Sequence, residues 1–309
     1  MTTRTLTSET TGPVLIDATL LGHGGLVTVR AEASCTRATL TIRTADETGA
    51  AADAVKAAGL RQSGTRLTAL VQGSGGDSGT TIVMGGGASV IQTFGTVHGS
   101  VTGMTITGNG NFVSGNVGGD VIINGVRVSG NGSTVIQGTS PIEITAVVPE
   151  GSSVEGYTTS ATIEAVGALL NVSGKTQSGS VRAGHVSRVE AKTQSGSVFV
   201  EQAAHIEAKT QSGSIKLGRT DVVTAKTMSG SIAITDFGGT VKADTMSGSI
   251  RIHATAGGDV RAKSMSGSVT VTATETALAD DLDVRADSMS GRVSIPQRRS
   301  GDSGPRRRR

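Results

Sequence analysis

The chain has 309 residues, of which 45 are glycine and 2% are aromatic, and it contains no tryptophan. Because compact globular cores depend on large aromatic side chains, this composition argues against an ordinary globular domain and favours a thin, layered core. The formal net charge is +3, but six arginines and one aspartate follow Pro296, which leaves 22 basic and 24 acidic residues in the rest of the chain.

The beginning of the chain carries no targeting signal. Residues 1–10 lack the apolar stretch of a secretory signal peptide, and no part of the sequence has the apolar length of a membrane span. Cys35 is the only cysteine, which excludes an internal disulfide and mildly favours a reducing compartment. We therefore expect a cytoplasmic protein with a flexible N-terminus over residues 1–13.

Residues 14–78 are expected to form a small β-rich unit that caps the rest of the fold. Three segments, 14–20, 26–32 and 37–43, alternate apolar and polar residues with a period of two, which is typical of strands with one buried face. Asp53–Ala58 is rich in alanine and predicts a short helix that ends at the following glycine.

Residues 79–140 contain a less regular repeat, rich in glycine and asparagine. The segment Gly103–Gly110 matches Gly125–Gly132, which lies 22 residues further on. Short valine-containing strands between glycine and asparagine turns predict irregular β-coils of the same kind of solenoid here.

Residues 141–295 contain the strongest pattern, a repeat built around Ser-Gly-Ser-Val/Ile whose glycine recurs after 17, 17, 17, 18, 19 and 24 residues. A repeat of this length forms one turn of a stacked coil rather than a domain. The fold class predicted is therefore all-β, a parallel β-solenoid, and right-handed because connections between parallel strands nearly always are. The bend glycines are Gly179, Gly196, Gly213, Gly230, Gly248, Gly267 and Gly291.

One coil shows how the repeat works. From residue 189 onward, Val189, Ala191, Thr193 and Ser195 share one face by their period of two, and the lysine and glutamine between them share the other. Gly196 then breaks the strand, either because the bend needs a positive φ or because the next coil's backbone approaches closely. Stacked neighbours must cover each coil and pair its backbone, since one coil buries too little to fold alone.

The repeat region resembles a known family. Residues 141–180 combine a strand, the turn Val-Val-Pro-Glu-Gly-Ser-Ser-Val and the segment Gly-Lys-Thr-Gln-Ser-Gly-Ser, and Thr-x-Ser-Gly-Ser-Val/Ile repeats follow. This run is similar to the bacterial putative-adhesin, β-strand-repeat family of unknown function, and the resemblance covers about residues 141–295. It implies a β-solenoid with no established catalytic residues, and the adhesin label implies display on a surface.

The sequence predicts no catalytic, cofactor-binding or metal-binding residues. Glycoside hydrolysis usually needs a positioned carboxylate pair, and the acids of the coils lie at different phases of the repeat. Sugar grooves also favour aromatic platforms, but Tyr157 is the only tyrosine. His185, His205 and His253 lie 6, 9 and 5 residues after a bend glycine, so they form no column, and no Cys/His cluster has zinc-ligand spacing.

Two outward columns are the candidate interaction sites. Stacked lysines form either a solvated ladder that deters lateral aggregation or a cationic stripe for a polyanion. Stacked methionines form a stripe that is covered by the chain's own loops or that contacts a partner or another copy. The two columns are Lys175, Lys192, Lys209 and Lys226, and Met228, Met246, Met265 and Met289.

Residues 296–309 lack apolar side chains and predict a disordered tail after the solenoid. The tail either serves solubility alone or attaches the solenoid to a polyanion such as nucleic acid, or to an anionic membrane. Its basic residues are Arg298, Arg299, Arg306, Arg307, Arg308 and Arg309.

These observations favour a non-enzymatic structural or interaction protein whose partner is another protein or a second copy of the chain. Three alternatives stay open. The first is a self-assembling filament like the bactofilins, which also use small β-helical coils. The second is a module that binds a polyanion or a membrane through its arginine tail. The third is a surface adhesin or a glycan-cleaving enzyme.

Overall fold

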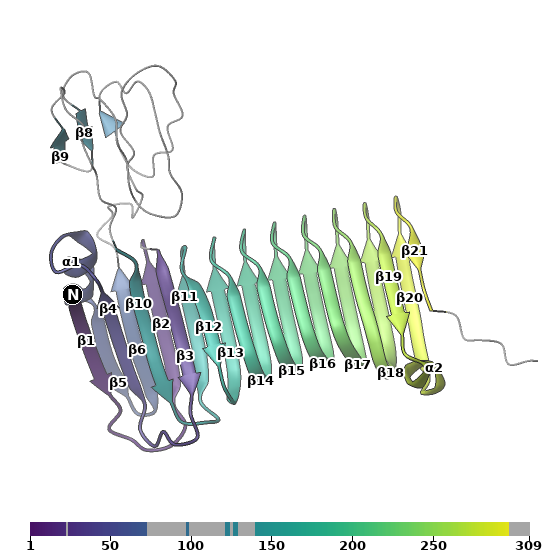
Figure 1. The fold of residues 1–309 in the computed structure, drawn as a ribbon, viewed down its shortest axis with the longest axis horizontal. Coiled ribbons are helices and arrows are strands. Elements are labelled where there is room, and N and C mark those ends of the chain that lie inside the picture. The colour runs from purple at the N-terminus through teal and green to yellow at the C-terminus, as the bar shows by residue number, and fades with distance from the viewer. Residues whose placement is uncertain (23, 73–96, 99–120, 124–125, 129–139, 297–309) are drawn as a thin grey trace, which may run out of the picture.

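The computed structural model describes residues 1–22, 24–72, 97–98, 121–123, 126–128 and 140–296. Its strands stack as a row of parallel coils along the long axis of the molecule (Figure 1). Within the described residues, 18 strands join into one continuous sheet, and three short strands form a second sheet. The β-solenoid predicted from the repeat is therefore confirmed.

The N-terminal strands are the first members of the same stack. Strand β2 pairs in parallel with β6 and β11, and β3 pairs in parallel with β10 and β12. Antiparallel partners, β1 on β4 and β5 on β6, close this end together with the helix α1. The elements are β1 (Thr2–Thr7), β2 (Leu15–Leu21), β3 (Gly25–Ala31), β4 (Thr39–Thr44), α1 (Ala50–Ala57), β5 (Gly59–Ser63) and β6 (Arg66–Gln72).

Residues 2–7, which we expected to belong to a flexible terminus, form the paired strand β1. Alternate side chains of β1 are half-buried, and Leu6 packs against the core. Arg4 donates hydrogen bonds to the carbonyl oxygens of Lys56 and Ala58 at the end of α1. These contacts hold the terminal segment on the cap, and the charged Arg4 protects an exposed sheet edge.

The irregular coils predicted for residues 79–140 lie largely outside the described residues. The described parts of this range are three strands that pair antiparallel with one another in the order β7–β8–β9. They are β7 (Val97–His98), β8 (Val121–Ile123) and β9 (Val126–Val128).

The regular coils follow from residue 140. Each is a single long strand that bends once and pairs in parallel with the same positions of its neighbour, 17 residues away in the most regular part. The elements are β10 (Ile142–Val148), β11 (Ser153–Thr158), β12 (Thr162–Val166), β13 (Leu169–Thr176), β14 (Val181–Thr193), β15 (Val198–Thr210), β16 (Ile215–Thr227), β17 (Ile232–Thr245), β18 (Ile250–Ser264), β19 (Val269–Ala273), α2 (Glu275–Ala279), β20 (Leu282–Ser288) and β21 (Val293–Ser294).

The core consists of columns of small apolar side chains. Val189, Ala191 and Thr193 are buried, as the period of two predicts, and the residues between them face outward. Ser195 was expected on the buried face but is exposed, because β14 ends at Thr193 and the chain has already turned. Equivalent residues stack from coil to coil, for example Ala191, Ala208, Ala225, Ala243 and Ala262.

The bend glycines are required by close approach between coils. A Cβ atom on Gly196 would lie 1.7 Å from the carbonyl oxygen of Gly179, and one on Gly213 would lie 1.7 Å from that of Gly196. None of the bend glycines has a positive φ. Of the two explanations that the sequence left open, the contact between backbones is therefore the correct one.

A hydroxyl group completes each bend. The Thr193 Oγ1 donates to the carbonyl oxygen of Gly179 at 3.2 Å and accepts the backbone N–H of Gly196 at 3.0 Å. The same two bonds recur at Thr210, and Thr227 repeats them one coil later. Each buried threonine thus satisfies one donor on its own coil and one acceptor on the preceding coil.

The longer spacings toward the C-terminus arise from local insertions. Strands β14, β15 and β16 have 13 residues, whereas β17 has 14 and β18 has 15, and the register shifts where they pair. The spacing of 24 contains α2, which the sequence analysis did not predict. Thr274 caps this helix, since its side chain accepts the N–H of Ala277 at 3.1 Å.

We predict that Gly213→Ala lowers the free energy of unfolding by about 3 kcal/mol, because the new Cβ meets backbone of the preceding coil, which has no room to relax. Gly24→Ala is the control, since nothing lies within 4 Å of its Cβ position and its φ is not positive. Urea unfolding monitored by circular dichroism measures both, and we expect a change within about 0.5 kcal/mol for the control. Equal midpoints for the two variants would contradict the close-contact explanation.

We also predict that Thr210→Val destabilises the fold by about 2–4 kcal/mol, while Thr210→Ser changes it by less than about 1 kcal/mol. Valine matches the shape of threonine but leaves the Gly213 N–H and the Gly196 carbonyl without their partner. Serine keeps the hydroxyl, as Ser264 does when it donates to the Gly248 carbonyl. Similar stability for the two variants would show that the hydroxyl contributes little.

Candidate functional site

The two candidate columns lie along one edge of the solenoid, where each long strand ends before its bend. Parallel pairing places Lys175 beside Lys192, then Lys209, then Lys226, one on each of four coils from β13 to β16. The next residue of each coil is the buried threonine of the bend, so the lysine points outward because its neighbour points inward. Register therefore holds the four ammonium groups in one row.

Only part of this positive charge is offset. Lys192 contacts Glu190 at 2.6 Å, and Lys209 contacts Glu207 at 2.5 Å, in each case two residues earlier on the same strand. The corresponding residues before Lys175 and Lys226 are Ser173 and Thr224, and neither lysine has an ion-pair partner within the described residues. Four lysines thus share two glutamates.

The ion pairs shift the pKa values of their members. The hydrogen bond to Glu190, and then its charge, raise the pKa of Lys192. The pKa of Glu207 is lowered first by its hydrogen bond from Lys209 and by the charge of Lys209, and further by Lys192 and Lys226 on the neighbouring coils. The Glu207 carboxylate therefore senses lysines of three coils.

A groove follows the lysine row. It has a volume of about 530 Å³, and glutamines of the bends stand opposite the lysines. Tyr157 closes the N-terminal end of the groove and Met228 the C-terminal end. Tyr157 is 45% exposed and pairs in register with Lys175. The lining residues are Tyr157, Lys175, Thr176, Gln177, Lys192, Thr193, Gln194, Lys209, Thr210, Gln211, Lys226, Thr227 and Met228. We call this the lysine groove.

The bend position changes from glutamine to methionine at β16. The methionine side chains are exposed by 49%, 46%, 49% and 80%, in chain order, and no loop of the described residues covers them. Backbone hydrogen bonds between bends hold successive members together, for example from the Ser247 N–H to the Met228 carbonyl at 2.8 Å. We call Met228, Met246, Met265 and Met289 the methionine stripe.

The charges beside the methionine stripe alternate in sign. The lysine row continues in register from Lys226 to Asp244, then Lys263, then Asp287. Arg261 and Arg285 pair with carboxylates of their own strands at 3.2 and 3.0 Å. This half of the edge is therefore balanced in charge, whereas the lysine groove is cationic.

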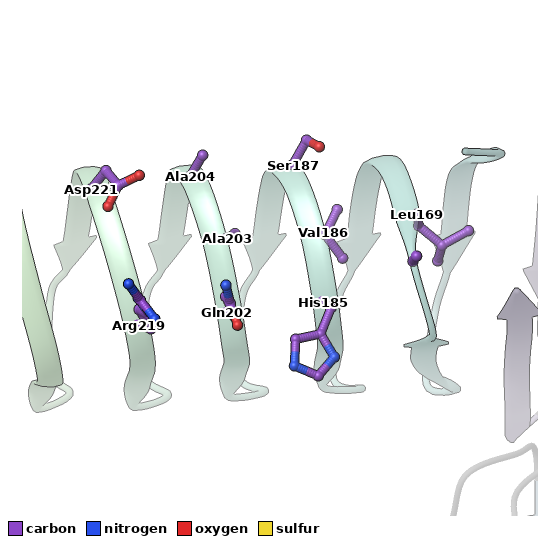
Figure 2. Close-up of a pocket in the computed structure, with 10 residues that line it drawn as sticks. Leu169, His185, Val186, Ser187, Gln202, Ala203, Ala204, Arg219 and Asp221 are labelled. Carbon is purple, nitrogen blue, oxygen red and sulfur yellow. The ribbon is translucent and has the colours of Figure 1, made fainter. Parts of the chain in front are cut away.

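A second hollow, which the sequence analysis missed, lies where the strands bend. Figure 2 shows His185, Gln202 and Arg219 on three successive coils, with Ser187 and Asp221 in the row beside them. Its volume is about 480 Å³. The only signal in the sequence is the common spacing of these residues, which becomes informative once the bend position is known. It contains one carboxylate, so it offers no pair for acid–base work.

The described residues contain no group of three or more His, Cys, Asp or Glu side chains that could hold a metal ion. Cys35 is half-exposed, and its Sγ donates to the carbonyl oxygen of Arg37 at 3.2 Å. Neither described helix has the length and apolar character needed to span a membrane. The arginines of the tail, from Arg298 onward, lie outside the described residues.

Comparisons with known proteins agree with this architecture. A family model described as Toastrack DUF4097 matches residues 99–307 of the chain, and this match bears out the family resemblance of its repeats. Among solved structures, the chain is similar to the crystal structure of a putative adhesin from Parabacteroides distasonis ATCC 8503, with a TM-score of 0.46 and 10% sequence identity over 95% of this chain and 96% of that one. No curated protein matches the chain.

We predict that Lys209→Gln raises the pKa of Glu207, because it removes the hydrogen bond and the charge that lower it most. The pKa is lower in the folded state, so the pair stabilises the fold above the unfolded-state value of about 4.3 and this contribution is lost as pH falls through the folded-state value. Glu207 is 46% exposed, which limits that contribution to about 1 kcal/mol or less. An NMR titration of the Glu207 carboxyl measures the shift, with Lys216→Gln on another face as control. An unchanged pKa in the first variant would contradict the assignment.

Proposed function

Because the chain belongs to the Toastrack DUF4097 family, we propose that it is a non-enzymatic scaffold protein whose solenoid holds rows of outward side chains for contact with another protein. The observation that carries this proposal is the register of the coils. Equivalent residues of neighbouring coils lie about 4.8 Å apart, so a repeated residue becomes a continuous surface row.

The methionine stripe is the surface best suited to bind a protein. Methionine side chains are apolar and flexible, and they adapt to irregular partner surfaces. Burying four half-exposed methionines would contribute about 3–6 kcal/mol, which is comparable to the lower estimates for the cost of association. The stripe alone therefore supports weak binding, and polar contacts beside it must supply the remainder.

The charges beside the stripe favour a second copy of the chain as the partner. If two stripes face each other antiparallel about a two-fold axis between β17 and β18, Met246 lies against Met265 of the second copy. The same arrangement brings Asp244 opposite Lys263 of the second copy, and Lys263 opposite Asp244. A two-fold interface repeats every favourable contact, so the alternating charges are self-complementary.

A filament is the second candidate, and one observation favours it. The last coil is less covered than the others: Val284 and Ala286 are half-buried, whereas Val260 and Ala262 below them are fully buried. No described strand pairs with the outer edge of β20, and such an edge can pair with another chain. The surface adhesin, the membrane or polyanion module and the cytoplasmic location stay predictions.

We predict that the chain associates with itself at micromolar to millimolar concentration and that Lys263→Asp weakens this association, because it places Asp against Asp across the two-fold axis. Adding Asp244→Lys to the same chain should restore association, since the exchanged pair is again complementary. Sedimentation velocity over a concentration series measures both variants, with Val222→Lys, on an exposed apolar residue away from the stripe, as control.

Met246→Lys with Met265→Lys should abolish association outright. A monomer at every concentration and salt would contradict both the two-fold contact and the filament. Open-ended growth seen by negative-stain microscopy, insensitive to the methionine substitutions, would support the filament instead.

A further inference from the structure

The lysine groove occupies the other half of the same edge, and the proposed two-fold contact does not use it. Its chemistry differs from that of the stripe, because the row on one wall is cationic and the bend residues on the other wall are amides. The groove runs across four coils in one direction. Its shape therefore suits an extended chain that lies along the solenoid.

The lysine row is left with unsatisfied charge. Lys175 and Lys226 have no carboxylate partner within the described residues, and like charges on adjacent strands repel each other. The later coils avoid this by alternating Asp244, Lys263 and Asp287 in the same row. The fold could balance the row in this way, and at the groove it does not.

The opposite wall offers hydrogen bonds. Gln177, Gln194 and Gln211 line the groove, and their side-chain amides have no hydrogen-bond partner among the described residues. A carboxamide can donate to and accept from a hydroxyl group, whereas an ammonium group only donates. The two walls together match a ligand that carries anionic oxygens on one side and hydroxyl groups on the other.

We propose that the lysine groove binds a carboxylate-bearing polysaccharide that lies along the solenoid axis. Successive lysines are spaced by about 4.8 Å, which is comparable to the length of one sugar unit, so each lysine meets one unit of a polymer with regularly placed carboxylates. Tyr157, the only tyrosine of the chain, lies at the end of this row and supplies one aromatic platform.

Two other polyanions fit the groove less well. Single-stranded nucleic acid is usually held by several aromatic side chains on which bases stack, and the groove has one. An anionic membrane is flat, whereas these lysines stand inside a groove. The two glutamates between the lysines also lower the charge density, which suits a carboxylate polymer better than a phosphate polymer.

The test is binding of the full-length chain to labelled polygalacturonate oligomers, measured by fluorescence polarisation at physiological salt. We expect Lys175→Gln with Lys226→Gln to weaken binding by about tenfold or more, because two charged contacts are lost. The matched control, Lys56→Gln with Lys216→Gln, removes the same charge from exposed sites outside the groove and should change binding by less than about twofold. Circular dichroism of each variant confirms that it is folded.

Oligomer length gives a second readout. The four lysines span roughly 14 Å, so affinity should rise up to about four sugar units and then level off. Tyr157→Ala should weaken the longer oligomers, while Tyr157→Phe should not.

Four outcomes would overturn the proposal. They are equal loss in the control variant, equal binding of a neutral dextran, tighter binding of single-stranded DNA or anionic vesicles through the same two lysines, and binding that deletion of residues 298–309 removes but the lysine substitutions leave intact. The last would assign polyanion binding to the arginine tail. None of these outcomes bears on the methionine stripe, because the substituted residues lie outside it.

Discussion

The contact between glycine backbones at the bends is the constraint on which the rest of this structure depends. Gly196 lies so close to the carbonyl oxygen of Gly179 that no Cβ fits between them, and the same is true one coil later. The Thr193 hydroxyl links the two bends, because it bonds to a carbonyl of one coil and to an N–H of the next. The bend is thus the narrowest point of the stack, and it fixes the register of every strand that leaves it.

Register then converts sequence columns into surfaces. The residue before the buried threonine is outward on every coil, so a repeated lysine becomes a row and a repeated methionine becomes a stripe. The same edge changes character at β16, where glutamine gives way to methionine and an all-positive row becomes an alternating one. One scaffold therefore carries two chemically different faces in line, which is consistent with an interaction role that needs no catalytic residues.

Much of this could be predicted from the sequence, because the repeat states the coil directly. The spacing of 17 residues, the period of two and the obligatory glycine give the parallel solenoid and place Lys175 and Met228 outward. What the sequence could not give depends on neighbouring coils. The ion pair of Lys209 with Glu207, the groove beside Tyr157 and the hollow at His185 arise only when strands distant in sequence are stacked. The short helix α2 was missed because it is brief and lies inside an irregular spacing, although Thr274 is a recognisable cap. Pairing of Thr2–Thr7 depended on contacts with α1 that local sequence does not state.

The near identity of coils β14, β15 and β16 has a consequence for how the chain reaches this structure. Each has 13 residues and the same lysine–threonine ending, so one coil could pair with its second neighbour and loop out the coil between them. Such a slipped state would keep the glycine contacts and the alternation, and little local energy separates it from the native pairing. The unequal strands β17 and β18, and the tie of β11 and β12 to the N-terminal strands, break this degeneracy at both ends. The irregular coils thereby act as alignment marks that give a repetitive chain a single native arrangement.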